Sequence, residues 1–272
     1  MLKKQRIVVK VGTSTITHDS GSMDLRRMEQ LARVLTDLQG SGHEIILVTS
    51  GAIAVGTAKM GLEERPKELR VKQAAAAVGQ CRMMHVYDTL FSEYNASVAQ
   101  ILLTGEDVED PARAEHLTNT FNALLERNII PIVNENDSVS SAEIETGAGK
   151  ILGDNDTLSA IVAKLCGADL LVLLSDIDGL YEANPRTHPD AALIPVVYSL
   201  TPEIMEMAGE AGSWRGTGGM ATKLSAAAIA TECGCDMVIT NGKRMDDLYR
   251  IVEGYSVGTR FISPKRQRSV EP

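Results

Sequence analysis

Six short runs of consecutive apolar residues recur along the chain, without regular alternation of polar positions. Continuous apolar character predicts strands buried on both faces, as in a parallel sheet covered by helices. The runs are RIVVKV (6–11), EIILVTS (44–50), SVAQILL (97–103), NIIPIV (128–133), DLLVLL (169–174) and DMVIT (236–240).

Helical patterns lie between these runs. Apolar residues within 25–38 recur at intervals of three and four, which predicts one buried helix face, and Gly40 and Gly42 end the pattern. Further helices are expected at 67–94, as one long helix or two in series with a closely packing alanine-rich centre at 74–77, at 112–127 and at 218–234. The alternation predicts an α/β fold, a three-layer α/β/α sandwich with an open, mainly parallel sheet.

Composition narrows the class of protein. No linker rich in Pro, Gly or Ser divides the 272 residues and no repeat is visible, so a single domain spanning 1–272 is expected. The formal net charge of −9 disfavours nucleic acid as a main partner. No apolar run is long enough for a membrane span or signal peptide, and the four cysteines lack zinc-ligand spacing. We therefore expect a cytoplasmic protein without a membrane partner.

Small and polar residues follow four of the predicted strands. In an open α/β sheet, ligands bind beyond the carboxyl ends of the strands. The segments there are KVGTS (10–14), TSGAIAVG (49–56), NEND (134–137) and SDIDGLY (175–181). Gly12 and Gly51 are expected to let the backbone turn tightly and approach a ligand, leaving N–H groups for an anion.

Lys10 stands between Val9 and Val11, inside a strand that otherwise reads as buried. A buried lysine is costly unless its charge is paired or its head reaches the end of the strand. A functional role is therefore favoured over the alternative, an edge strand with a solvated lysine.

The segment GTGGMATK (216–223) precedes an alanine-rich helix. Glycines before a helix N-terminus, with Lys223 adding positive charge, suit a bound phosphate; the alternative is a flexible connector before a capped helix. A second glycine-rich segment, TGAGKIL (146–152), fails as a P-loop because Ile144 and Ile151 stand where Gly and Ser or Thr are needed. The first strand is not followed by G-x-G-x-x-G, so a dinucleotide-binding fold is disfavoured too.

Two clusters of amides and carboxylates lie less than twenty residues apart, in NEND (134–137) and GDND (153–156). The first can bind an ammonium group and donate amide hydrogen bonds to carboxylates. The second stands at a helix start, where Asp and Asn are also common as caps. Together with Lys10 and Lys223, the two clusters favour a polar ligand site.

The ordered motifs VVKVGTS, VTSGAIAVG, VNENDSV, GDNDTLSA, SDIDGLY and GTGGMATK closely resemble the amino-acid kinase family, in particular its glutamate-phosphorylating members. The resemblance runs from about Arg6 to about Thr259 and includes the helix KQAAAAVGQ (72–80). It implies ATP-dependent phosphorylation of the γ-carboxylate of L-glutamate to glutamyl 5-phosphate, the first step of proline biosynthesis. Magnesium would be held mainly by ATP phosphates and water, so no protein metal ligand is assigned.

The resemblance also implies roles for individual residues. Lys10 and Lys223 would flank the transferring phosphate as catalytic residues, and Asp156 would hold the two lysines in position. The glutamate-binding set would be Ser50, Asp137 and Asn155. The nucleotide contacts would be Lys10, Ser175, Asp176, Thr217, Gly218, Gly219, Met220, Ala221, Thr222 and Lys223. A glutamate carboxylate, with a pKa of roughly 4.3, is already ionised at neutral pH and needs no general base.

The chain departs from the family pattern in two places. Many bacterial members carry a C-terminal PUA domain, which is not expected here, and TGAGKIL lengthens a loop over the substrate site. The implied partners are ATP and L-glutamate, proline as a feedback inhibitor, further copies in a homo-oligomer, and glutamyl-phosphate reductase for channelling. The alternatives are an acetylglutamate, aspartate, carbamate or uridylate kinase, or a non-catalytic amino-acid sensor.

Overall fold

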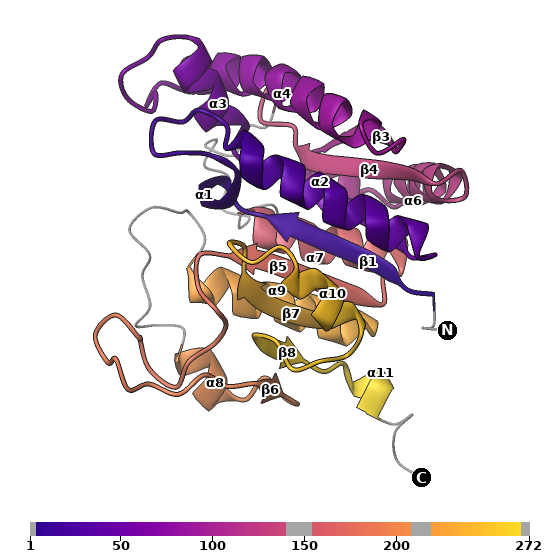
Figure 1. Cartoon of the computed structure of the whole chain (residues 1–272), viewed down its shortest axis with the longest axis vertical. Helices are drawn as coiled ribbons and strands as arrows, with labels where there is room; N and C mark the ends of the chain where they lie inside the picture. The colour runs from indigo at the N-terminus through magenta and orange to yellow at the C-terminus, as the bar shows by residue number, and fades with distance from the viewer. Residues whose placement is uncertain (1–3, 140–153, 208–218, 268–272) are drawn as a thin grey trace.

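The computed structural model describes residues 4–139, 154–207 and 219–267. Within them, one eight-stranded sheet forms the centre of the molecule (Figure 1). Its strands are β1 (Arg6–Val11), β2 (Glu44–Val48), β3 (Ser97–Leu103), β4 (Ile129–Glu135), β5 (Leu170–Ser175), β6 (Val196–Val197), β7 (Asp236–Asn241) and β8 (Thr259–Phe261). The six predicted strands are all present, with ends shifted by at most two residues.

The strand order is β3-β4-β2-β1-β5-β7-β8-β6. All neighbours from β3 to β7 pair in parallel. β8 runs antiparallel to β7, and β6 pairs in parallel with β8. The mainly parallel sheet is confirmed, whereas β6 and β8 were not predicted because strands of two and three residues carry too little hydrophobic pattern.

Helices of the described residues lie in most of the connections between strands, and one more helix follows the last strand. They are α1 (Thr13–Ile16), α2 (Leu25–Gly40), α3 (Ala52–Lys59), α4 (Leu69–Ser92), α5 (Gly105–Glu109), α6 (Pro111–Leu125), α7 (Asn155–Cys166), α8 (Pro202–Glu206), α9 (Met220–Cys233), α10 (Asp247–Val252) and α11 (Pro264–Gln267). The predicted segment 67–94 is one helix, α4. None of the helices in the described ranges combines the length and apolar character that crossing a bilayer would require.

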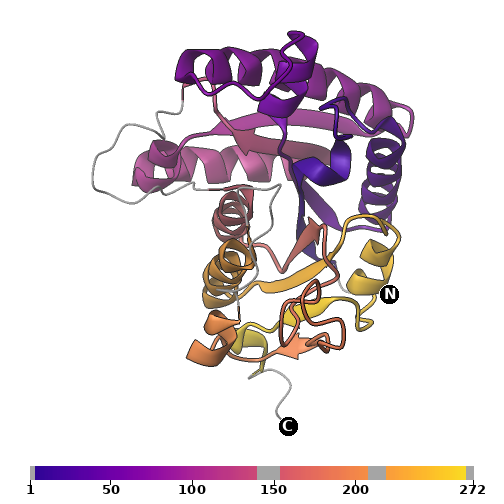
Figure 2. The ribbon, with the colours of Figure 1, turned by 90° about the vertical axis from the view of Figure 1, so that its left-hand side faces the viewer.

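Helices cover both faces of the sheet, which gives the predicted three layers. Figure 2 shows the sheet nearly edge-on, with α6, α7 and α9 on one side and α2 and α10 on the other. Alternate residues of β1 enter two different cores: Ile7, Val9 and Val11 pack with α2, α4 and α10. Val8 packs on the opposite face with α6, α7 and α9. This burial on both faces explains the unbroken apolar runs.

Small residues bring α3 and α4 into close contact. A Cβ atom added at Gly56 would lie 1.7 Å from the carbonyl oxygen of Ala75, and one added at Gly79 would lie 1.8 Å from that of Ala52. Only glycine fits at such distances, so the alanine-rich centre of α4 packs as closely as predicted. α4 also meets the end of β4, where Gln80 accepts a hydrogen bond from Asn134.

Two expectations about the strands were wrong. β3 is an edge strand with Ser97 and Gln100 exposed, so it is not buried on both faces. In addition, β4 continues through Glu135, so Asn134 belongs to the strand instead of the loop after it. Hydrogen bonding to β3 extends β4, because Leu102 and Leu103 pair with Asn134 and Glu135. The carboxyl ends of β1, β2, β4 and β5 still meet at one edge of the sheet, where the candidate site lies.

Candidate active site

Two lysines share one buried carboxylate at the carboxyl edge of the sheet. Lys10 Nζ lies 2.6 Å from Oδ1 of Asp156, and Lys223 Nζ lies 3.0 Å from Oδ2. The side chains come from β1, α7 and α9, and Asp156 is only 2% exposed. The contact at Oδ1 is an ion pair without hydrogen-bond geometry, whereas Lys223 donates a hydrogen bond to Oδ2.

Local capping explains why Asp156 points inward. Asp154 is the N-cap of α7, and its Oδ1 accepts hydrogen bonds from the N–H groups of Asp156 and Thr157. The cap therefore needs only one of the three polar residues in DND. The side chain of Asp156, in the first turn of α7, is not needed for the cap and pairs with the two lysines. Thr222 of α9 donates a further hydrogen bond to Asp156 Oδ2 at 3.1 Å.

The charges in this cluster stabilise one another. Burial disfavours the ionised form of Asp156, but the nearby ammonium groups of Lys10 and Lys223 outweigh burial and hold the pKa of its carboxyl at about 2. The side chains of Lys10 and Lys223 are 11% and 9% exposed. Two cations held by one anion leave a net positive site, which suits a phosphate group.

Lys10 lies in a central strand, because β1 pairs with β2 on one side and with β5 on the other. The alternative of an edge strand is therefore wrong. The chain does turn at Gly12, where the Thr15 N–H donates to the Gly12 carbonyl oxygen at 3.0 Å, but its φ of −80° is open to any residue, so this turn does not require glycine. Gly51, with φ of +96°, does adopt the left-handed conformation that favours glycine.

The residues predicted for glutamate lie around the ends of β2 and β4. Asn155 Nδ2 donates to the carbonyl oxygen of Thr49 at 3.0 Å. Ser50 Oγ donates to the carbonyl oxygen of Val11 at 3.1 Å and lies 3.1 Å from the Thr13 hydroxyl. Ser50 is thus bonded to the end of β1, which carries Lys10, and Asn155 to the end of the neighbouring strand β2.

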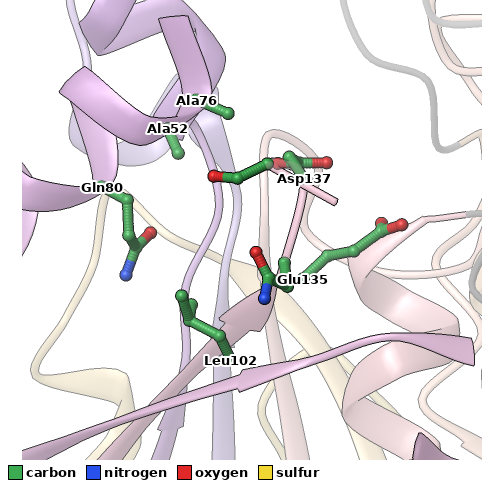
Figure 3. Close-up of a pocket in the computed structure, with 8 residues that line it drawn as sticks. Ala52, Ala76, Gln80, Leu102, Glu135 and Asp137 are labelled. Atoms are coloured by element: carbon green, nitrogen blue, oxygen red, sulfur yellow. The ribbon is translucent and has the colours of Figure 1, made fainter. Parts of the chain in front are cut away.

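Asp137 lines a small pocket just after β4. The pocket is lined by Ala52, Ala76, Gln80, Leu102, Glu135, Asn136, Asp137 and Ser138. Figure 3 shows Asp137 on one side of this pocket and Gln80 of α4 on the other. Asp137 is half-buried.

The sequence matches the model of the amino acid kinase family over residues 5–241. The chain belongs to the amino acid kinase family. It is 52% identical to glutamate 5-kinase from Clostridium perfringens (strain 13 / Type A) over 261 residues, 96% of each chain. It is 50% identical to glutamate 5-kinase from Listeria innocua over 265 residues, 97% of this chain and 95% of that one. Within the family, this chain is therefore grouped with the glutamate 5-kinases.

Solved structures of other amino acid kinases share the fold at low sequence identity. The carbamate kinase from Giardia lamblia bound to AMP-PNP has a TM-score of 0.65 at 16% identity, covering 97% of this chain and 100% of that one. The isopentenyl phosphate kinase of T. acidophilum, in a product complex, has a TM-score of 0.60 at 15% identity, covering 94% and 99%. These similarities support the predicted fold class.

The predicted nucleotide residues of this amino acid kinase lie partly within the described chain. Thr217 and Gly218 lie outside it, as does the TGAGKIL segment. Gly219 is the N-cap of α9 and provides no side-chain cap, and Met220, Ala221, Thr222 and Lys223 form the first turn. At the end of β5, Ser175 donates to Asp176 at 3.2 Å, and the exposed Asp176 pairs with Arg186 at 3.5 Å. The pairing with Arg186 was not predicted.

Sequence reasoning also missed a residue of the pocket wall. Gln80 accepts a hydrogen bond from Asn134 at 2.9 Å and is buried. Its signal in the sequence is a polar residue at the end of an alanine- and glycine-rich helical segment, KQAAAAVGQ. That signal does not reveal a partner 54 residues away.

Proposed function

We infer that this chain catalyses the ATP-dependent phosphorylation of the γ-carboxylate of L-glutamate, which gives L-glutamyl 5-phosphate in the first step of proline biosynthesis. Identity of about half to glutamate 5-kinases along nearly the whole chain supports the substrate. The observation that carries the chemistry is the buried cluster of Lys10, Asp156 and Lys223.

The acceptor needs no general base in this reaction. The carboxylate of glutamate is ionised at neutral pH, so the difficulty lies in bringing two anions together in line. Lys10 and Lys223 neutralise charge on the phosphoryl group as it passes between donor and acceptor oxygens. Asp156 keeps the two ammonium groups on either side of the same carboxylate, which fixes their positions before substrates bind.

The start of α9 fits the phosphates of ATP. Its N-cap, Gly219, makes no side-chain hydrogen bond to the first turn, so backbone N–H groups and the positive end of the helix dipole are available to an anion. Mg²⁺, bound together with ATP, would supply positive charge that neutralises the phosphates. We propose that ATP phosphates and water would hold this ion, and we assign it no protein ligand.

Gly12 keeps space open beside the lysine head. A Cβ atom added there would lie 3.7 Å from Lys10 Nζ and 3.8 Å from the carbonyl oxygen of Leu174. We expect Gly12→Ala to change the free energy of unfolding by less than about 1 kcal/mol, since its φ suits alanine. The methyl group nevertheless occupies room for phosphate, so kcat/KM for ATP should fall about tenfold.

Gly51→Ala is the contrasting variant for this prediction. Its φ of +96° predicts a stability loss on the order of 1–3 kcal/mol. Thermal unfolding and steady-state kinetics of both variants make the comparison. A Gly12→Ala enzyme with unchanged kinetics would contradict a phosphate site beside Lys10.

Asp137 is proposed to pair with the ammonium group of glutamate. Asp137→Ala should chiefly raise the KM for glutamate, by about tenfold to a hundredfold, with a smaller change in kcat. The matched control is Asp88→Ala, which removes an exposed carboxylate from α4. Equal kinetic effects of the two substitutions would contradict the assignment of Asp137 to the glutamate site.

An acceptor assay tests the proposed function. ADP production and hydroxamate formation are measured with ATP and, separately, glutamate, N-acetylglutamate, aspartate and carbamate. Glutamate-dependent ADP and hydroxamate are expected. ADP with another acceptor alone would favour that kinase, and binding of glutamate without ADP would favour an amino-acid sensor.

We extend the proposal to regulation and partners. Proline acts as a feedback inhibitor by occupying the glutamate pocket near Asp137, because a small amino acid can use the same ammonium and carboxylate contacts. Titration of proline should then raise the apparent KM for glutamate, and saturating glutamate should relieve inhibition. We also propose a cytoplasmic homo-oligomer that passes its labile acyl phosphate to glutamyl-phosphate reductase.

A further inference from the structure

Side-chain amides from three elements form a hydrogen-bonded chain behind the candidate glutamate site. Asn155 Nδ2 donates to the Thr49 carbonyl oxygen at 3.0 Å and to Asn134 Oδ1 at 3.4 Å. Asn134 Nδ2 donates in turn to Gln80 Oε1 at 2.9 Å. The chain runs from α7 through β4 to α4, so it joins the two polar sequence clusters to a helix that neither contains.

The backbone sets the direction of every amide in this chain. The Thr49 carbonyl can only accept, so Asn155 must present its NH₂ group there. The second N–H of Asn155 is directed to Oδ1 of Asn134, and Gln80 favours this orientation of the Asn134 amide because its Oε1 accepts from the Asn134 NH₂ group. Both donors of Asn155 are then used. Its Oδ1 receives no hydrogen bond from the described residues and remains for a ligand.

Gln80 is an unfavourable residue for packing alone. It is 7% exposed, and its Nε2 is buried without a hydrogen-bond partner among the described residues. A buried unpaired donor destabilises the fold, whereas an apolar side chain of similar length would avoid that cost. Its surroundings on the pocket side include Ala52 and Ala76, and Figure 3 shows the side chain reaching down from α4 beside them. What Gln80 provides is the acceptor oxygen for Asn134.

We propose that Gln80 is a positioning residue that acts through Asn134 to hold Asn155 with its Oδ1 toward the amino-acid substrate, where this oxygen accepts a hydrogen bond from the free α-ammonium group. The proposal rests on the proposed function, because the resemblance places Asn155 at the glutamate site. An acceptor in this position distinguishes a free amino group from an acylated or missing one.

Gln80→Met tests the proposal by removing the acceptor while conserving length. The KM for glutamate should rise about tenfold, with kcat within about twofold and the KM for ATP unchanged. Glutarate has both carboxylates of glutamate but no ammonium group. Its inhibition constant against glutamate should therefore be the same in Gln80→Met as in the wild type.

Gln39→Met is the matched control. Gln39 donates a hydrogen bond to the carbonyl oxygen of Asn128 at 3.0 Å, before the start of β4 and at the opposite end of that strand from Asn134. The same substitution there should leave both constants unchanged, and thermal unfolding of the two variants separates stability from binding. In an Asn155→Ala background, adding Gln80→Met should raise the KM for glutamate no further, because the residue it positions is gone.

Two kinetic outcomes overturn the proposal. An equal rise of the glutarate inhibition constant, or a multiplied effect in the Asn155→Ala background, would mean that Gln80 acts through packing. A wild-type enzyme that phosphorylates no glutamate would refute the proposed function instead. In that case NMR still tests the hydrogen-bonded amide chain. Gln80→Met should shift the side-chain NH₂ signals of Asn134 and Asn155, and unshifted signals would refute the proposed positioning by Gln80.

Discussion

Lys223→Ala should lower kcat by about 10²-fold or more, the range found when a group that stabilises transition-state charge is removed. The side chain is held against Asp156 at 3.0 Å in the first turn of α9, so no other described lysine occupies its position. Because Lys223 stabilises charge on the phosphoryl group during its transfer and does not bind glutamate, the KM for glutamate should change little. Lys10→Ala should lower kcat by a similar factor, because Lys10 pairs with the other oxygen of the same carboxylate.

Lys164→Ala is the control for the lysine variants. Lys164 is exposed on α7, the helix that carries Asp156, so its loss changes net charge equally without touching the cluster. Rapid-quench measurement of the first turnover shows whether the chemical step itself is slowed. An unchanged kcat in both Lys10→Ala and Lys223→Ala would rule out their assigned catalytic roles.

Asp156→Asn should have the second large effect, on activity and stability together. The substitution conserves shape but leaves two poorly exposed ammonium groups without their shared counter-ion. Breaking a buried ion pair from one side typically costs about 3–5 kcal/mol, and kcat should fall about 10²-fold to 10³-fold as the lysines lose their positions. Urea unfolding and steady-state kinetics measure the two effects.

The stability effect of Asp156 should depend on pH. Its pKa is held at about 2 in the folded protein against an ordinary value of 3.8. Since the unfolded carboxyl binds its proton at higher pH, the stabilisation is fully present above about pH 4 and is lost as pH falls toward 2, by roughly 2 kcal/mol. The difference in unfolding free energy between wild type and Asp156→Asn should therefore narrow in that range.

Asp236→Asn is the control for Asp156→Asn, because it removes a buried carboxylate that lies away from the candidate active site. Asp236 is 3% exposed and accepts a hydrogen bond from the Ser263 N–H at the start of β7, the end of that parallel strand away from the site. It should lower stability and leave kcat unchanged in the folded fraction. If Asp156→Asn behaved in the same way, Asp156 would be a structural residue alone.

Much of the architecture could be predicted because its signals are local along the chain. Apolar runs identified each long strand, since a strand covered on both faces has no polar alternation. The same criterion misassigned β3, because an apolar sequence does not show whether a strand has one neighbour or two. β6 and β8 were missed because strands of two and three residues are stabilised by pairing with their neighbours more than by their own pattern.

Local sequence signals were enough to predict the six longer strands, most of the longer helices, the mainly parallel sheet and an unusual lysine in a buried strand. It could not assign a partner to each polar residue in NEND and GDND, because capping and ligand binding use the same side chains. The folded chain shows that Asp154 caps α7, whereas Asp156 pairs with lysines from β1 and α9. It also brought Gln80 to Asn134 across 54 residues. Hydrophobic periodicity and capping act over a few residues, whereas these contacts join side chains from elements that are far apart in the sequence and meet only in the folded chain.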